Sequence, residues 1–337
     1  KLKKVYIKEI NFLRFLSITT VVFYHYFPSI IPNGYLGVDL FFVISGFLIS
    51  LYIYREVKEK KFTLLNFYNR RIKRIIPATI FLLFFVTIFS ILLLTKFDLI
   101  NFSKSLFYSL FFSSNFFFWL DGGYFGPNDK LKPLLHLWSL AVEEQFYIFF
   151  PIFFYFILKF SKKIEIIFLI VLFFILSSLA LNIYLVNLGG QNPAFFLLPT
   201  RVWNFGFGVL AMLLYISKNK FHTDLEIIFY ILMIIIGFAF KTPYLPENFI
   251  VIFFSFLILQ KKFPKKFILH FLFHNKVVQY IGIISFSLYL WHWPMLVFLE
   301  YYYVIELKIF SKFIILILSI LFSILSYHLI EFNFKYK

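Results

Sequence analysis

The stretch RFLSITTVVFYH, from Arg14 to His25, decides which kind of fold this chain can adopt. Between its two end residues it carries no charge, and it is apolar enough to lie in a lipid bilayer. An arginine and a histidine inside such a run are costly unless they face a cavity or a partner. The stretch therefore predicts a membrane-embedded helix and marks two side chains as candidates for a function.

The composition of the whole chain indicates the same environment. Apolar residues make up 61% of the chain and charged residues 15%, and the mean hydropathy is +0.87. A soluble domain has roughly half apolar and a quarter charged residues, so the chain is predicted to be an integral membrane protein. It contains no cysteine, which excludes disulfides, thiolate nucleophiles and zinc–thiolate sites. No metal site is predicted.

The predicted fold is all-α, a single bundle of about ten transmembrane helices in one domain over residues 1–337. Each predicted span is close to the roughly 20 residues that cross about 30 Å of hydrocarbon. The segment 97–135 is too polar and irregular for a span, and its paired glycines and two prolines predict an ordered loop. The predicted spans are residues 10–28, 37–54, 76–95, 138–158, 164–186, 199–216, 225–240, 247–260, 278–303 and 311–330.

The basic residues that give the chain its net charge of +17 are distributed as in a membrane protein rather than as in a nucleic-acid binder. Basic residues cluster in the short segments between apolar runs. With a cytoplasmic N-terminus, 24 of the 33 Lys and Arg residues fall in inside segments and 7 in outside segments. This excess predicts a multi-pass protein with both termini in the cytoplasm, in contact with membrane lipids and with no nucleic-acid partner.

Arg14 and His25 are eleven residues apart, which is about three helical turns, so their side chains share one face. They are separated by roughly 16 Å along the helix axis. With the N-terminus inside, Arg14 lies at the cytoplasmic edge and His25 lies deeper, toward the far leaflet. The pair either belongs to a functional site or consists of a snorkelling arginine and a histidine that hydrogen-bonds a neighbouring helix.

A second cationic stretch is NRRIKRIIP, from Asn69 to Pro77. Arg71 and Arg74 are at positions i and i+3, so they meet on one helical face. The arginine fork suits phosphate, which predicts capture of a polyanionic cytosolic ligand such as a nucleotide-based coenzyme. The alternative is a positive-inside anchor or a contact with anionic lipid.

The stretch HLWSLAVEEQFY, from His136 to Tyr147, places a histidine and two glutamates at the start of a predicted span. His136 and Glu143 are two turns apart and are predicted to share a helix face, with Glu144 next to it. They form either an acid/base pair or proton relay, or a structural polar cluster between helices. Three further polar residues within or at the end of apolar runs are predicted to be structural: Arg201, His292 and Glu331. The neighbouring tryptophans and proline predict an interfacial, kinked position for His292.

Taken in order, six stretches resemble the bacterial membrane-bound acyltransferase 3 family. The first carries that family's Arg-x10-His signature, and the third carries its Arg-x-x-Arg pattern. Any one stretch alone is a weak match, whereas six in order over about 330 residues are specific. The stretches are NFLRFLSITTVVFYH, GYLGVDLFFVISGFLIS, FYNRRIKRIIPA, YFGPNDKLKPLLHLWSLAVEEQFYIFFP, SFSLYLWHWPM and SYHLIEFNF.

The resemblance implies transfer of an acyl group, usually acetyl from acetyl-CoA, onto a hydroxyl of a glycan. The acceptor would be a free or lipid-linked surface polysaccharide, lipopolysaccharide or peptidoglycan, and the location the bacterial cytoplasmic membrane. By position in the motifs, His25 would be the essential catalytic histidine and Arg14 would help hold the CoA thioester. Arg71 and Arg74 would engage the CoA phosphates.

The resemblance also implies that His136 and Glu143 or Glu144 support catalysis or the acceptor side. Either His25 deprotonates the acceptor for direct attack on the thioester, or an acyl-enzyme forms first. The competing hypotheses are a secondary transporter or lipid flippase that uses the same buried residues, and a sensor or scaffold. Many relatives with a similar loop continue into an extracytoplasmic SGNH-type domain; this chain is expected either to act alone or to lack that domain.

Overall fold

A computed structural model of the chain describes residues 8–122, 131–217, 221–240, 246, 248–264, 267–303 and 308–336. In these residues the secondary structure is helical apart from an isolated bridge between Phe221 and Lys262. The predicted all-α class is therefore confirmed. Several basic residues and the YFGPNDK part of the fourth motif lie outside the described residues; the basic residues are Lys1, Lys3, Lys4, Lys218, Lys220, Lys241, Lys265, Lys266 and Lys337.

A helix occupies every one of the ten predicted spans. In the described residues, six helical segments are long and apolar enough to cross a membrane, as expected for a multi-pass membrane protein: Gly34–Lys58, Leu64–Leu93, Leu137–Phe160, Ile164–Asn187, Lys276–Tyr303 and Ile309–Phe334. Two shorter apolar helices are Val202–Ser217 and Phe249–Leu259. The other two predicted spans are α1, Lys8–Tyr26, and α10, Asp224–Ala239.

The structure corrects the start of the third predicted span and the nature of the segment after it. Helix α3, Leu64–Leu93, begins twelve residues before the predicted position 76, because Thr63 caps it by accepting a hydrogen bond from the Asn66 N–H. The basic motif is therefore part of the helix. The segment predicted as a loop contains α4, Lys96–Leu110, capped by Thr95, and α5, Ser114–Leu120.

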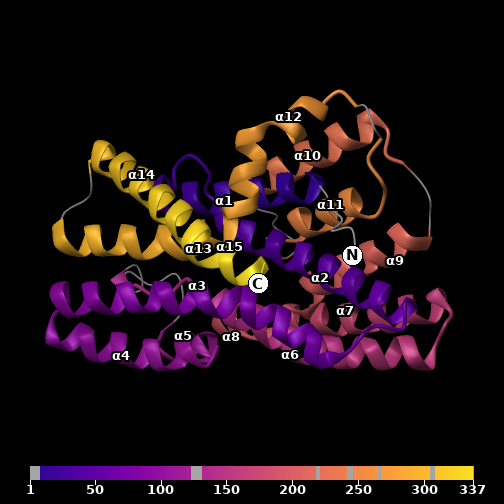
Figure 1. The fold of residues 1–337 in the computed structure, drawn as a ribbon, viewed down its shortest axis with the longest axis horizontal. Helices are drawn as coiled ribbons and strands as arrows, with labels where there is room; N and C mark the ends of the chain where they lie inside the picture. Colours follow the sequence, from indigo (N-terminus) through magenta and orange to yellow (C-terminus); the bar gives the residue numbers. More distant parts are fainter. Residues whose placement is uncertain are drawn as a thin grey trace. The chain divides into compact units, whose positions relative to one another are not determined.

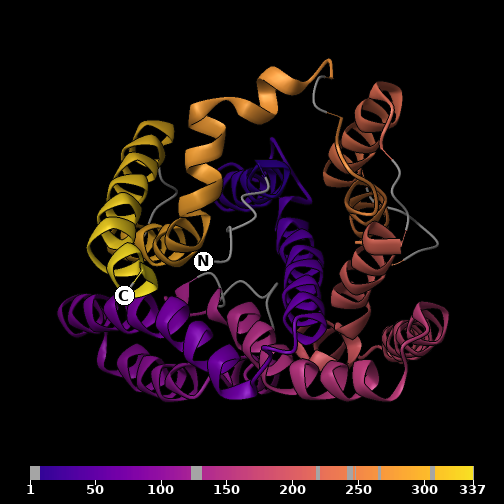
Figure 2. The same cartoon turned by 45° about the vertical axis from the view of Figure 1, so that its right-hand side comes forward.

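The chain forms two compact units, each assembled from three stretches of sequence. Unit 1 consists of Lys1–Arg55, Phe154–Ser177 and Val202–Ser285, and unit 2 of Glu56–Phe153, Ser178–Arg201 and Phe286–Lys337. Figure 2 shows the paired helices α10 and α11 (Phe249–Leu259) of unit 1 lying side by side, in agreement with their packing.

Unit 1 is held together by close approaches of helix backbones. A Cβ on Gly37, at the start of α2 (Gly37–Lys58), would lie 2.4 Å from the Ser17 carbonyl oxygen of α1. A Cβ on Gly46 of α2 would lie 2.0 Å from the carbonyl oxygen of Phe205 in α9, Val202–Ser217. Both crossings therefore require glycine, as is common where membrane helices pack through small residues.

A buried hydrogen-bond network around Asp39 joins three helices of unit 1. Asp39, in the first turn of α2, is only 4% exposed. It accepts hydrogen bonds from Asn204 of α9 and, at 2.9 Å, from Asn248, the residue before α11. A carboxylate in an apolar interior needs such donors, so this interaction fixes α2, α9 and α11 in one arrangement.

Unit 2 is built around α3, α6 (Leu137–Phe160) and the second part of α13 (Lys276–Tyr303). The Tyr68 hydroxyl of α3 donates to the Ile148 carbonyl of α6 at 2.8 Å. Trp291 of α13 packs against Phe322 of α14 (Ile309–Ser326), with ring centroids 5.1 Å apart. A π-helix, η4 (Tyr327–Glu331), and α15 (Phe332–Tyr336) follow α14 and pack against α3 (Figure 1).

Candidate active site

Helix α1 carries both Arg14 and His25 without interruption, so the predicted shared face is present in the structure. Both side chains are half-buried. The Tyr24 ring lies 5.2 Å from the His25 ring and 5.2 Å from the ring of Tyr35, which precedes α2. His25 is therefore at the end of α1 that is packed against the start of α2.

The rotation of α1 is fixed by contacts on two sides. Ser17 meets the backbone at Gly37, and Asn11 donates to the Gln279 side chain of α13 at 3.0 Å. At about 100° per residue, Arg14 and His25 project between these two contact directions. The packing of unit 1 thus holds both side chains in a defined orientation.

In unit 2 the structure brings together four of the predicted site residues. Arg71 of α3 interacts electrostatically with Glu143 and Glu144 of α6, and Arg74 interacts with Glu144. Tyr147, one turn after Glu143, donates a short hydrogen bond to the Glu143 carboxylate. Sequence reasoning assigned the arginines and the glutamates to separate tasks, whereas the fold places them in one cluster, which we call the Arg–Glu cluster.

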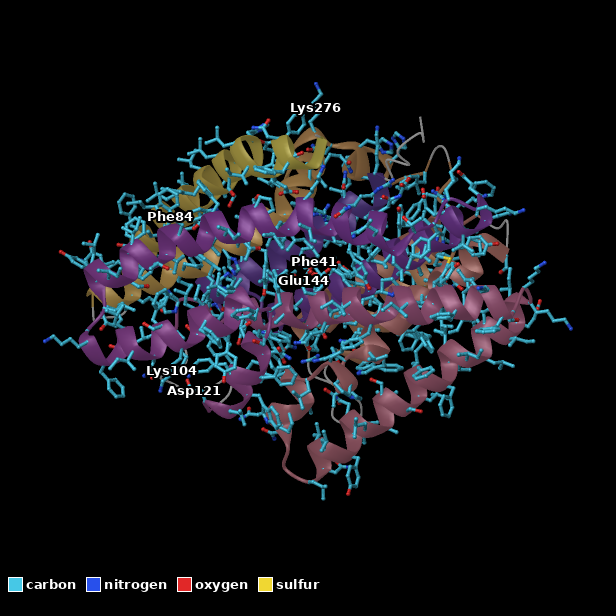
Figure 3. The ribbon with its side chains drawn as sticks, turned by 60° about the horizontal axis from the view of Figure 1, so that its bottom comes forward. Phe41, Phe84, Lys104, Asp121, Glu144 and Lys276 are labelled. Carbon is cyan, nitrogen blue, oxygen red and sulfur yellow. The ribbon has the colours of Figure 1, made fainter. Side chains whose placement is uncertain are left out.

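The register between α3 and α6 explains this cluster. The Arg71 guanidinium carbon lies 5.3 Å from the centroid of the Tyr147 ring and 5.6 Å from that of Phe67. Together with the bond between Tyr68 and Ile148, this contact shows that α3 and α6 run antiparallel here. Figure 3 shows Glu144 among the helices of unit 2, whereas Lys104 of α4 lies at its rim.

Two atoms of the Arg–Glu cluster are buried without a partner. Among the described residues, neither the Nε donor of Arg71 nor the Oε1 acceptor of Glu144 has a hydrogen-bond partner. Arg70 and Lys73, on the other side of α3, are exposed. Since buried polar atoms normally find partners, the two orphaned atoms point to a ligand that supplies both an acceptor and a donor.

The structure places His136 in the turn directly before α6, which begins at Leu137. In this tight turn the Leu137 N–H donates to the Leu134 carbonyl and the Trp138 N–H to the Leu135 carbonyl, each three residues back. The His136 ring lies against α13, 5.6 Å from the ring of Tyr289, and the shared face with Glu143 stays a prediction.

Helix α13 packs against His136 through Tyr289, which was not among the predicted site residues, and His292, which was predicted to be structural. The Tyr289 hydroxyl donates to the His136 carbonyl at 2.5 Å and lies 2.6 Å from the Ser139 hydroxyl. The His136 Nε2 atom lies 3.1 Å from the Leu290 carbonyl, and the His136 and His292 rings are 5.9 Å apart. Tyr289 and His292 both lie within the SFSLYLWHWPM motif, which carried the only sequence signal for Tyr289.

The three residues predicted to be structural are all buried. Arg201 donates from Nε to the Phe195 carbonyl at 2.8 Å and lies over the Phe195 and Trp138 rings. Glu331, in the π-helix, accepts a hydrogen bond from Ser287 at 3.1 Å. His292 is fully buried within α13, Pro294 is accommodated inside the helix, and the flanking tryptophans are buried as well; the interfacial depth of His292 stays a prediction.

The arrangement is that of a multi-pass helical membrane protein with ionisable side chains inside its helices. In the part of the chain that the structure describes, no three His, Asp or Glu side chains are placed to hold a metal ion. The chain belongs to the acyltransferase 3 family, because the family profile described as an acyltransferase domain matches residues 7–328.

Curated relatives extend this family assignment. O-acetyltransferase OatA of Staphylococcus aureus strain NCTC 8325 is 32% identical over 353 aligned positions, covering 98% of this chain and 58% of the relative. The putative O-acetyltransferase SACOL0978 of S. aureus strain COL is 33% identical, covering 99% of this chain and 58% of the relative. This chain thus spans less than two thirds of the length of these relatives. No solved structure matches the chain significantly.

Proposed function

We propose that this protein is a membrane-bound O-acyltransferase that moves an acetyl group from cytosolic acetyl-CoA to a hydroxyl of a cell-surface carbohydrate. The observation that carries the proposal is the pair of orphaned buried atoms in the Arg–Glu cluster, Arg71 Nε and Glu144 Oε1. A transferase for a phosphate-bearing donor requires a buried cation that is not already neutralised by a close ion pair. The names of the relatives, O-acetyltransferases, support the same reaction class.

Donor binding is assigned to the cationic side chains. Arg71 and Arg74 would engage the phosphates of CoA through their planar forks. With the N-terminus and C-terminus in the cytoplasm, as the positive-inside rule predicts, α3 starts at the face from which CoA arrives. Arg14 of α1 would hold the thioester end of the donor.

The chemical step requires a base, because a hydroxyl is a poor nucleophile at neutral pH. His25 would be the catalytic histidine, since an imidazole titrates near the operating pH. The acceptor oxygen forms a bond to the carbonyl carbon as its proton passes to the base; the C–S bond breaks and CoA leaves with a proton. His136, Glu143 and Glu144 would act on the acceptor side, and no metal is required.

The test uses the full-length protein in membrane vesicles with labelled acetyl-CoA and a pentamer of N-acetylglucosamine as the acceptor. We expect base-labile acetyl label on the carbohydrate, and a loss of roughly 10²- to 10⁴-fold for His25→Ala. His328→Ala, at an exposed histidine, is the matched control and should transfer normally. Wild-type transfer by His25→Ala would overturn the catalytic role of His25, whereas a vesicle proton flux driven by substrate without any acetyl transfer would overturn the proposal in favour of a transporter.

A further inference from the structure

Pro294 creates an unusual hydrogen-bond acceptor in the middle of α13. The proline lies inside this helix, four residues after Leu290. In a regular helix the N–H of residue i donates to the carbonyl of residue i−4, but proline has no N–H. The Leu290 carbonyl therefore loses its usual helical donor and is available to another group.

That group is the imidazole of His136. Its Nε2 atom lies 3.1 Å from the Leu290 carbonyl oxygen. A carbonyl can only accept, so Nε2 must carry the hydrogen in the neutral ring. The contact therefore selects one tautomer, in which Nδ1 of His136 bears the lone pair.

The ring is fixed as well as its tautomer. The Tyr289 hydroxyl donates to the His136 carbonyl, and the Ser139 hydroxyl then donates to the Tyr289 oxygen. The loop before His136 is tied to the same helix, because the Trp293 indole N–H donates to the Lys132 carbonyl at 2.9 Å. His136 thus sits in a rigid frame made by the turn and α13.

Within this frame the Nδ1 lone pair accepts no hydrogen bond from the part of the chain that the structure describes. His136 is 2% exposed, and Nδ1 has no hydrogen-bond partner among the described residues. A buried acceptor that lacks a donor destabilises the protein until a ligand supplies one. The titratable groups that face it are His292 and Tyr289 of α13; His292 Nδ1 lies 2.7 Å from the Tyr289 carbonyl, and the Tyr289 hydroxyl bonds to the His136 carbonyl and to Ser139.

We infer that Nδ1 of His136 is the atom that accepts the hydrogen bond of the acceptor hydroxyl, and that Pro294 is a positioning residue that selects this tautomer by freeing the Leu290 carbonyl. The ligand class is an uncharged hydroxyl of a carbohydrate, because an orphaned acceptor requires an O–H or N–H donor. This inference rests on the proposed acyl transfer. It gives His136 a recognition task that is separate from the base assigned to His25.

Two substitutions of His136 separate recognition from structure. His136→Gln retains a side-chain N–H that reaches the Leu290 carbonyl but lacks an acceptor at the Nδ1 position. His136→Asn loses the reach to Leu290 but places an amide oxygen near the Nδ1 position. With labelled acetyl-CoA and the N-acetylglucosamine pentamer, we expect His136→Gln to raise the acceptor KM about 10-fold with an unchanged donor KM. His136→Asn should raise it less.

A third variant tests the proline. Pro294→Ala returns an N–H to the Leu290 carbonyl, so His136 is no longer held in one tautomer. We expect a several-fold rise in acceptor KM, whereas Pro151→Ala in α6 should leave it unchanged. Nitrogen NMR of histidine-labelled protein reports the tautomer without any substrate; it should show hydrogen on Nε2 of His136 in the wild type and a mixture in Pro294→Ala.

The outcomes separate this inference from the proposed function. A wild-type protein that transfers acetyl, together with an unchanged acceptor KM in His136→Gln, overturns the role of Nδ1 and leaves the acyltransferase proposal standing. A hydrogen on Nδ1 in the wild-type NMR spectrum overturns the role of Pro294. A wild-type protein that transfers no acetyl overturns the proposed function and the recognition role together, while the tautomer is still decided by NMR.

Discussion

The guanidinium group of Arg71 lies against the ring of Tyr147, with 5.3 Å between the guanidinium carbon and the ring centroid. The contact joins α3 to α6 within unit 2. The hydroxyl of the same tyrosine donates to Glu143. One aromatic side chain thus contacts both a cationic and an anionic member of the Arg–Glu cluster.

Donor affinity should depend on the inward-facing arginines of α3 and not on their outward-facing neighbours. Arg71→Ala and Arg74→Ala are each expected to weaken acetyl-CoA binding by about 10- to 100-fold, since hydrogen bonds to charged groups contribute about 1.5–3 kcal/mol. Arg70→Ala and Lys73→Ala remove the same charge from the exposed side of the helix. Calorimetry on the detergent-purified protein measures all four; equal losses at all four positions would indicate a non-specific charge effect.

Removing only the hydroxyl of Tyr147 should separate the two halves of the Arg–Glu cluster. Tyr147→Phe keeps the ring under Arg71 but takes away the hydrogen bond to Glu143. Donor affinity is expected to stay within about twofold of wild type, whereas kcat falls about 10-fold because an uncompensated carboxylate is left in an apolar setting. Steady-state kinetics with varied acetyl-CoA checks this; a raised donor KM with unchanged kcat would place Tyr147 in donor binding instead.

The span positions could be predicted because the bilayer requires about 20 apolar residues per helix, and this requirement is local in sequence. The start of α3 was missed because it depends on the Thr63 cap, not on apolarity. The turn that ends at His136 was not predicted because it depends on backbone hydrogen bonds, not on apolarity. The meeting of Arg71 with Glu144 depends on the register between two helices, which no single stretch encodes.

Asp39 shows the same limit in unit 1. The residue lies inside GYLGVDLFFVISGFLIS, a stretch that resembles a motif of the acyltransferase 3 family. Its donors, Asn204 and Asn248, are more than 160 residues away in the chain. Sequence alone marks a carboxylate in an apolar helix as unusual, but only the fold identifies its partners.

The glycine at the start of α2 should be required for the orientation of Arg14 and His25. Gly37→Ala adds a Cβ that would meet the Ser17 carbonyl at 2.4 Å, so α1 must shift. Overpacking of this kind costs typically about 1–3 kcal/mol, and we expect a lowered Tm together with a lowered kcat. Tm is measured by differential scanning fluorimetry.

Gly189→Asn is the control for this substitution. Its Cβ would meet nothing within 4 Å, and asparagine tolerates the positive φ of 80° at this position. It should match the wild type in both Tm and kcat. An unchanged kcat in Gly37→Ala would show that the rotation of α1 does not depend on this crossing.

The hydrogen bonds in the network around Asp39 should be cooperative, because its carboxylate accepts from two amide donors at once. Asp39→Ala leaves the buried amides of Asn204 and Asn248 without their acceptor, and Asn204→Ala leaves the carboxylate with one donor fewer. Each single variant should therefore lower the free energy of unfolding, while the double variant should cost less than the sum of the two. The coupling energy between Asp39 and Asn204 is expected at about 0.6–1.7 kcal/mol, the range of hydrogen bonds between membrane helices.

Unfolding by denaturant in mixed micelles measures all members of the cycle. Additive losses would mean that the two residues stabilise unit 1 independently of each other.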